Sequence, residues 1–428
     1  MRRTVIALFI LCITAVNALA QPPSIGGYNV YYGDLHNHSN ASDGHVDATS
    51  ASAYHYARYT AGLDFFSLAD HSDQYGDFTP AKWLDIKNQA NAHHQDGVFV
   101  ALHGFEWSHA THGHVAVINT DDYCSHLVAP TNTFGGLVSW LASRPASVAF
   151  FNHPGRQNKT EEEFGHFTGS PSRQFVGMEL WNKSHHFSTY WDNDGYNPNN
   201  NMGHYDEALS KGWRIGASGA RDYHGQYSGS WGAFRMAVLA SSLTRNHLLS
   251  AMRTRRFYST LDKSIALSFT VNGKEMGSVL EPGTYNFRVR ATNGDGKPFT
   301  KVELFRDRVG GNQRVVVWTA DGINASSIDR SVSRVTSPGD IYYVRVSGID
   351  DDDKNQAISS PVWITNCGEE YVALRNITSN QTITSCDVVV EHVTIRNNAR
   401  LTINARNGVY IERDFEVQPG STLEINMQ

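Results

Sequence analysis

The first 260 residues alternate between two hydrophobic patterns. Short apolar runs at residues 30–35, 63–69 and 98–102 are typical of buried strands, and the stretch 47–61 between them has helical spacing. Thr79-Pro80 indicates a helix start, because threonine caps a first turn and proline is tolerated there. Further strands are expected at 115–118, 147–151, 175–180 and 215–218, and further helices at 134–143, 205–211 and 243–253.

Repeated strand–helix units predict an α/β domain over residues 28–262, with a parallel sheet that is either open or closed into a barrel. After residue 263 the pattern changes to short alternating strands at 265–271, 283–291, 301–306, 314–318 and 342–346. Asn272-Gly273 and Asn293-Gly294 are typical of hairpin turns. These features predict an immunoglobulin-like β-sandwich over residues 263–365.

The last segment, residues 366–428, has shorter and more polar strands at 393–396, 401–405, 409–413 and 422–425. It predicts a small all-β C-terminal module of solenoid or sandwich type, with a role in sorting or surface attachment. Before it, the charge run from Asp350 to Lys354 is expected to be a solvated loop, with calcium binding as the alternative reading.

The N-terminus has the pattern of an export signal. Arg2 and Arg3 precede an apolar stretch over residues 5–16, and Ala18-Leu19-Ala20 is a small-x-small cleavage site. Residues 1–20 therefore predict a signal peptide and a secreted protein, whether periplasmic, extracellular or held at the cell surface. No later segment has the ~20 apolar residues that a transmembrane helix needs.

The net charge argues against a nucleic-acid partner, and the cysteines indicate a disulfide and not a metal site. The full chain has a net charge of −6, and removal of the leader with its two arginines makes it about −8, which argues against nucleic acid. An oxidising compartment allows a disulfide between Cys367 and Cys386, with Cys124 left free. Because Cys-x-x-Cys is absent, we do not expect cysteine to hold a metal.

Histidines are concentrated in the first domain, where they follow predicted strands. Of 20 histidines, all but His247 and His392 lie between His36 and His224. Residues that suit a metal follow five strand ends, which is where α/β barrels place their chemistry. Imidazole and carboxylate donors favour zinc, manganese or iron. The segments are Asp34-Leu35-His36-Asn37-His38-Ser39 with Ser42-Asp43-Gly44, Asp70-His71, Glu106, Asn152-His153-Pro154, and Asp222-Tyr223-His224.

Together with His114, these segments resemble the PHP (polymerase and histidinol phosphatase) metallohydrolases, and most of all their secreted carbaryl-hydrolase-like branch. Arg255-Arg256-Phe257-Tyr258-Ser259-Thr260 and Ser359-Ser360-Pro361-Val362-Trp363 also resemble that branch. The resemblance covers about residues 30–365. It implies a distorted (β/α)7 barrel with two to three divalent metal ions.

The resemblance also implies a role for each ligand. His36, His38, Glu106 and Asp222 would hold a first metal, and Glu106 would bridge to a second that His114 and His153 complete. Asp43, His71 and His224 would hold a third. His112 is the alternative to His114, which is preferred because it directly precedes an apolar strand. The catalytic residues expected are Glu106, His153, Asp222 and His224.

Metal ions that share Glu106 would provide a hydroxide nucleophile at neutral pH. The resemblance favours phosphoester hydrolysis of a small molecule, and Arg156 and Arg221 are candidate phosphate-binding residues because a guanidinium matches phosphate geometry. Two alternatives stay open. One is an ester, carbamate or amide hydrolase on the same site, and the other is a non-catalytic, metal-stabilised surface protein.

Overall fold

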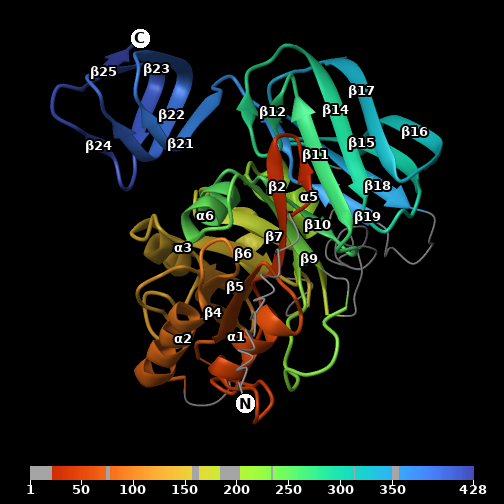
Figure 1. The fold of residues 1–428 in the computed structure, drawn as a ribbon, viewed down its shortest axis with the longest axis vertical. Helices are drawn as coiled ribbons and strands as arrows, with labels where there is room; N and C mark the ends of the chain where they lie inside the picture. The colour runs from red at the N-terminus through yellow and green to blue at the C-terminus, as the bar shows by residue number, and fades with distance from the viewer. Residues whose placement is uncertain are drawn as a thin grey trace, which may run out of the picture.

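The computed structural model describes residues 22–73, 78–156, 163–183, 203–232, 235–312, 314–348 and 356–428. The predicted leader and the charge run from Asp350 to Lys354 lie outside these ranges. Figure 1 shows an α/β unit below, a β-sandwich at the upper right and the C-terminal strands at the upper left. Among the described residues, no helix has the length and apolar character needed to cross a membrane.

The α/β unit is built on one curled sheet. Strands β2, β3 and β4 are mutually parallel, as are β6, β7 and β8. The expectation of a wholly parallel sheet is wrong at β5, which runs antiparallel to β4 and β6, and at β9, which runs antiparallel to β2. The bounds are β2 Tyr28–Asp34, β3 Phe65–His71, β4 Val100–His109, β5 Gly113–Ile118, β6 Val148–Asn152, β7 Phe175–Asn182, β8 Gly216–Ala220, β9 Arg235–Ala240 and β10 Phe257–Thr260.

The physical reason for the reversal at β5 is the short connection before it. Only three residues separate β4 from β5, and so short a link joins antiparallel strands, whereas a parallel pair needs a long crossover. Strands β9 and β10 were not predicted. The sheet is curled, and its closure into a seven-stranded barrel stays a prediction from the resemblance.

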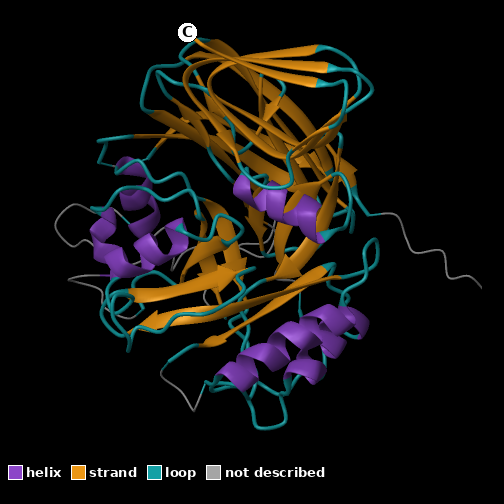
Figure 2. Cartoon of the chain, turned by 90° about the vertical axis from the view of Figure 1, so that its left-hand side faces the viewer, coloured by secondary structure: helices purple, strands orange, loops and turns teal. Residues whose placement is uncertain are grey.

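Helices lie on the outside of the curled sheet (Figure 2). Thr49, Thr79, Thr133 and Thr244 cap α1, α2, α3 and α6, and each threonine side chain accepts a hydrogen bond from a backbone N–H of the first turn. The helix start expected at Thr79-Pro80 is confirmed. The bounds are α1 Ser50–Tyr59, α2 Pro80–His93, α3 Phe134–Ala142, the 3-10 turn η1 Glu163–Phe167, α5 His204–Ser210 and α6 Arg245–Arg253.

Two sheets follow in the sandwich region. One contains β11, β12, β14 and β17, and the other continues the sheet of the α/β unit, because β19 pairs with β10. The buried side chains of Phe269, Phe287, Val302 and Val344 belong to one core cluster between the two sheets. The bounds are β11 Ile265–Val271, β12 Lys274–Glu275, β13 Val279–Leu280, β14 Thr284–Asn293, β15 Phe299–Arg308, β16 Val315–Ala325, β17 Ser327–Val335, β18 Asp340–Gly348, β19 Gln356–Ser359 and β20 Val362–Ile364.

The two predicted hairpin turns have different outcomes. Asn272 and Gly273 join β11 to β12 with φ values of 47° and 79°, as a two-residue hairpin requires. Asn293-Gly294 does not form a hairpin, because β14 pairs with β11 and β17 while β15 pairs with β16 and β18 in the other sheet. The Gly294 N–H donates to the Ser264 carbonyl, which turns the chain toward the second sheet.

The C-terminal module is a stack of parallel strands. Each turn pairs in register with the next, so that Ile383 lies opposite Ile403, and Ile403 opposite Ile425. Of the two architectures expected, this parallel pairing is the solenoid type. The disulfide between Cys367 and Cys386 is present, and Cys124 is free and buried. The bounds are β21 Glu369–Ile377, β22 Gln381–Ile395, β23 Arg400–Ile411, β24 Glu416–Val417 and β25 Thr422–Met427.

Candidate metal centre

Strand ends bring the predicted residues to one edge of the curled sheet. His36 and His38 follow β2, His71 is the last residue of β3, and Glu106 lies within β4. His153 follows β6 directly. The remaining predicted residues are Asp43 in the loop after β2, His114 on β5, and Asp222 and His224 after β8.

Two of these positions have an unusual backbone conformation. His153 has a φ of 28° and Asp222 a φ of 47°, both in the left-handed region that disfavours residues with a Cβ. Such a conformation costs on the order of 1 kcal/mol or more, and it persists only where the surrounding structure imposes it. Both residues lie just after a strand end, His153 after β6 and Asp222 after β8, where the chain changes direction.

The nine predicted residues form four overlapping groups, and within each group the potential ligand atoms lie within 4.8 Å of one another. Glu106, His36, His38 and His71 each belong to two groups, so the groups share side chains as a multinuclear centre does. The groups are His36, His38 and Asp222; His36, Glu106 and His153; His71, Glu106 and His114; and His38, Asp43, His71 and His224.

Glu106 is at the middle of this arrangement. Its carboxylate is fully buried, with Nε2 of His36 at 3.0 Å and Nδ1 of His71 at 2.8 Å. Nδ1 of His114 lies at 3.3 Å and Nε2 of His153 at 3.4 Å. Four imidazoles from four strands therefore converge on one carboxylate, which is the placement expected of a bridging ligand.

His112, the alternative to His114, lies elsewhere. Its ring contacts that of His109 at a tilt, with the ring centroids 4.3 Å apart, and it belongs to none of the four groups. His114 is on β5 opposite Ser108 of β4, and this pairing directs its side chain toward Glu106. Geometry thus favours His114.

The sequence did not single out Glu179, a buried carboxylate on β7. Its Oε1 lies 2.8 Å from Nδ1 of His36, and its Oε2 accepts hydrogen bonds from the His153 backbone N–H and from Nδ2 of Asn182. Holding Nδ1 of His36 leaves Nε2 directed at Glu106. An acid within the otherwise apolar strand Phe175–Asn182 was the signal that could have revealed it.

Other polar side chains fix the loops that carry the histidines. Asp70 accepts hydrogen bonds from the backbone N–H and the hydroxyl of Ser39 and from the hydroxyl of Ser42. Asp34 accepts from the backbone N–H groups of His36 and Arg221. Both carboxylates are fully buried, and burial raises the pKa of Asp34 to about 7. Their hydrogen bonds tie the loop after β2 to β3 and to the loop after β8.

Burial and neighbouring charges shift the pKa values of the carboxylates and of two of the histidines, for different reasons. Burial raises the pKa of Glu106 and Asp222, but nearby histidines outweigh it and hold both pKa values well below the ordinary range. Burial lowers the pKa of both His38 and His153 to about 3, which leaves them neutral donors. These conditions suit cation binding, since the carboxylates are charged and two imidazoles are unprotonated at neutral pH.

His36 and His71 differ, because the carboxylates next to them outweigh burial. Burial alone would lower the pKa of His36, but Glu106, Asp222 and Glu179 raise it well above the ordinary value. Burial likewise opposes the shift at His71, where Glu106 and Asp43 raise the pKa to about 10. Without a cation, both imidazoles therefore carry the positive charge that balances the buried acids.

The two predicted phosphate-binding arginines are placed differently. Nη1 of Arg156 lies 2.7 Å from Oδ2 of Asp222, so its guanidinium is at the centre. Arg221 instead donates to the carbonyl of Trp231 and packs over the ring of that residue. The Arg221 side chain therefore lies against Trp231, and its role in phosphate binding stays a prediction. Lys183 was not predicted, and its Nζ lies 3.3 Å from Oδ2 of Asp222.

The fold and site together define a mixed α/β protein with a candidate multinuclear centre of histidines and carboxylates. No family model matches the sequence. An uncharacterized protein of Chlamydia pneumoniae is 23% identical over 368 residues, which cover 78% of this chain and 57% of that protein. This chain thus spans little more than half the length of that curated relative.

Among solved structures, the chain is similar to a two-domain protein from Bacteroides vulgatus that contains a predicted PHP-like metal-dependent phosphoesterase. The two are 15% identical, with a TM-score of 0.42, over 80% of this chain and 96% of the other. The carbaryl-hydrolase-like branch stays a prediction from sequence. Function is therefore inferred from the residues of the centre themselves.

Proposed function

We propose that this protein is a metal-dependent hydrolase that acts on a small-molecule phosphate ester. The observation that carries the proposal is the convergence of nine histidine and carboxylate side chains in four overlapping groups around buried Glu106. So many ionisable groups are costly to bury, and metal coordination is a common reason for burying them together. Imidazole and carboxylate donors suit zinc, manganese or iron.

The donor atoms of two of the histidines fit a metal, because each of these rings is held at its other nitrogen. Nδ1 of His36 is held by Glu179, and Nδ1 of His224 donates to the carbonyl of Asp222. Fixing one ring nitrogen in this way sets the tautomer and directs the other nitrogen to a cation. His36, His38 and Asp222 would hold one cation, Glu106 with His114 and His153 a second, and Asp43, His71 and His224 a third.

Bound divalent cations would supply Lewis acidity, which lowers the pKa of water and offsets negative charge on the substrate. The side chains of the protein would position the cations and supply protons. Glu106 would keep two cations close together, and Asn152 steadies it through a hydrogen bond of 2.7 Å from Nδ2 to Oε1. His224, with a side chain 25% exposed, is the most accessible of the candidate histidine ligands. Where no third cation is bound, it is the histidine best placed to give a proton to a leaving group.

Two cationic side chains beside Asp222 favour phosphate over carboxyl substrates. Arg156 and Lys183 both approach Oδ2 of Asp222, and the Lys183 side chain is 43% exposed. When cations neutralise Asp222, these two groups become available to an anionic substrate. A phosphoryl transition state carries more negative charge than a carbonyl one, so it gains more from them.

The test combines metal analysis with paired substrates. We expect two to three equivalents of transition metal per purified chain, with kcat/KM higher for a small phosphate ester than for a matched carboxyl ester. Arg156→Ala should slow the phosphate ester by roughly 30- to 200-fold, as loss of a charge-assisted contact does, while Arg221→Ala is the control that leaves this selectivity unchanged.

Three outcomes would contradict this reading in different ways. Less than half an equivalent of metal after metal-supplemented expression would reject the centre. If carboxyl esters or carbamates react faster than phosphate esters in the wild type and in both variants, the protein is an ester or carbamate hydrolase that uses the same metal centre. Full metal occupancy with no turnover on any substrate would leave a metal-stabilised surface protein, the non-catalytic alternative.

We also propose that the protein works outside the cytoplasm, attached to the cell surface through residues 366–428. Residues 1–20 have the pattern of an export signal, and the disulfide between Cys367 and Cys386 suits an oxidising compartment. Cell fractionation tests this proposal. Removal of residues 366–428 should abolish surface retention, and a full-length protein found only in the cytoplasm would contradict it.

A further inference from the structure

A second cavity lies at the opposite end of the sheet from the metal centre. It has a volume of about 290 Å³ and is lined by residues just before β6, β7 and β8, by the end of α6, and by the C-terminal module. The candidate metal ligands follow or lie near the other ends of these strands. β6 is five residues long, so roughly 15 Å of strand separates the two regions.

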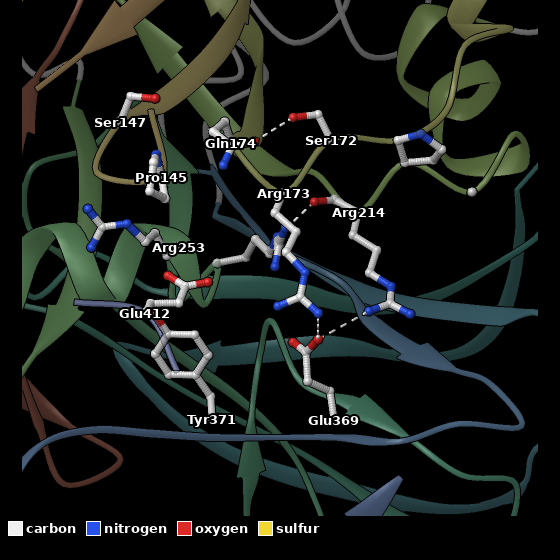
Figure 3. A pocket seen from close by; sticks show the side chains of 13 residues that line it. Pro145, Ser147, Ser172, Arg173, Gln174, Arg214, Arg253, Glu369, Tyr371 and Glu412 are labelled. Atoms are coloured by element: carbon white, nitrogen blue, oxygen red, sulfur yellow. Dashed lines mark hydrogen bonds and ion pairs between the residues drawn. The ribbon is translucent and has the colours of Figure 1, made fainter. Parts of the chain in front are cut away.

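Arginine dominates this cavity. Figure 3 shows Arg173 and Arg214 converging on Glu369, with ion-pair distances of 3.3 Å and 3.7 Å. Arg253 and Arg255 also line it, so four arginines and two acids, Glu369 and Glu412, contribute to the same cavity. Arg253 has its own buried partner, Glu391, at 2.6 Å. Glu412 is a weak counter-ion, because burial first and Glu391 second raise its pKa.

Arg255 is the most informative of these residues. Its side chain is buried, with 7% of the residue exposed. Among the described residues, its guanidinium donates a hydrogen bond from Nε to the carbonyl of Arg214 and forms no ion pair with a carboxylate. Burial lowers its pKa to about 10, although the nearby charge of Glu369 acts to raise it, and Arg255 stays cationic at neutral pH. A buried cation without a paired carboxylate is costly unless another anion joins it.

The backbone conformation of Arg255 also indicates that its side chain has a role in this cavity. Arg255 follows α6 at a position where helices usually have glycine, with a φ of 53°. The N–H groups of Arg255 and Arg256 donate to the carbonyls of Met252 and Ala251, the pattern of a helix end that favours glycine at this position. Arginine is therefore less favourable than glycine in this backbone conformation. Its presence indicates that the guanidinium side chain has a role here that glycine could not fill.

We propose that this cavity binds a small oxyanion, a phosphate, sulfate or carboxylate group, with Arg255 as its buried contact and Arg173 and Arg214 as its half-exposed contacts. Guanidinium groups match the geometry of such oxyanions in a bidentate manner. Tyr371 and Pro145 form parts of the wall, one from the C-terminal module and one from the α/β unit. Because the walls belong to both, a bound anion would also stabilise the contact between these parts.

Isothermal titration calorimetry on the metal-free, full-length chain with Glu106→Gln tests this site, because this substitution keeps residual cations, which would themselves bind oxyanions, out of the metal centre. The probes are inorganic phosphate, sulfate and acetate at constant ionic strength. We expect one saturable site for at least one probe. Arg255→Gly should weaken it by about tenfold or more, while the backbone keeps its fold because glycine suits a positive φ.

Controls separate the cavity from general charge effects. Arg173→Ala should also weaken binding, whereas Arg288→Ala, which removes an exposed arginine paired with Asp329 on the sandwich, should not. The probe that binds most tightly identifies the oxyanion class. No saturable binding of any probe below about 10 mM, or equal binding by the Arg255→Gly chain, would overturn the proposal. Neither readout depends on turnover, so this result stands apart from the proposed hydrolase function.

Discussion

At the scale of single residues, Glu106 decides how the centre works. Its carboxylate is fully buried and within 3.4 Å of imidazole nitrogens from His36, His71, His114 and His153. Removing its charge while keeping its shape should therefore weaken more than one cation site. Glu106→Gln is expected to lower bound metal by more than one equivalent and to abolish most turnover.

Matched histidine variants sharpen this test. His114→Ala should lose about one equivalent of metal, and His112→Ala none, because His112 lies outside the four groups. The measurement is elemental analysis beside kcat/KM for each variant. Wild-type turnover in Glu106→Gln would contradict the bridging role.

Metal uptake should also release protons, because imidazole ligands must be neutral. The pKa of His71 is raised to about 10 and that of His36 well above its ordinary value, so both are protonated without metal at pH 7.5. Metal binding is therefore expected to release about two protons per chain and to strengthen as pH rises from 6 toward 9. His38 and His153, with pKa values of about 3, add nothing in this range.

Calorimetry in buffers with different ionisation enthalpies measures this release. The His71→Ala chain should release about one proton fewer than the wild type at the same pH. Binding heats that are independent of the buffer would mean that the two histidines are already neutral, which would contradict the charge balance described for the metal-free centre.

At the scale of elements, β7 acts on the centre without supplying a proposed ligand. Glu179 on this strand holds His36 by its side chain and His153 by its backbone. Glu179→Gln should lower metal affinity by roughly 10- to 100-fold, as loss of a ligand-orienting carboxylate does, with a smaller effect on the folded stability. Glu303→Gln, on β15 of the sandwich, is the matched control and should leave affinity unchanged.

Competition with a chelator measures this affinity, and thermal unfolding of both metal-free variants separates it from a general loss of structure. Equal affinities for Glu179→Gln and the wild type would show that packing alone fixes the His36 ring.

At the scale of the whole molecule, the C-terminal module is bound to the α/β unit. Arg253 of α6 pairs at 2.6 Å with Glu391 of β22, and both side chains are buried. Glu391→Gln in the full chain should therefore lower stability by roughly 3–5 kcal/mol, because it leaves Arg253 buried without its partner. Removing residues 366–428 should also lower stability, because the whole contact between the two parts is lost. Turnover should persist, because the candidate metal ligands lie at the opposite strand ends.

The truncated chain ending at Thr365 tests this by thermal unfolding beside kcat/KM. Glu391→Gln in the full chain should reproduce part of the loss, because Arg253 then stays buried without its partner. A large fall in turnover at equal stability would mean that the module contributes to the active site, which would contradict this placement.

The sequence by itself determined which local helices and strands form and which polar residues come directly after the strands. Capping threonines and apolar runs predicted α2, β6 and β11, because such signals act within a few residues. Strand ends followed by His36, His153 and Asp222 predicted the residues that the structure brings together, since parallel strand ends meet at one edge of a sheet. The Cys367–Cys386 pairing was likewise read correctly.

Only the tertiary structure decided the features that depend on contacts distant in sequence. The direction of β5 follows from the short link after β4, and the sequence pattern missed this because it ended that strand at residue 102 instead of His109. The path after Asn293 follows from which strands pair in each sheet. Glu179 and Lys183 lie next to candidate ligands, and the Arg221 side chain contacts Trp231, because side-chain direction at a strand end depends on what packs against it. The arginine cavity depends on the same kind of contact, because Arg255, Arg214 and Glu369 are far apart in the chain and line one cavity between the α/β unit and the C-terminal module.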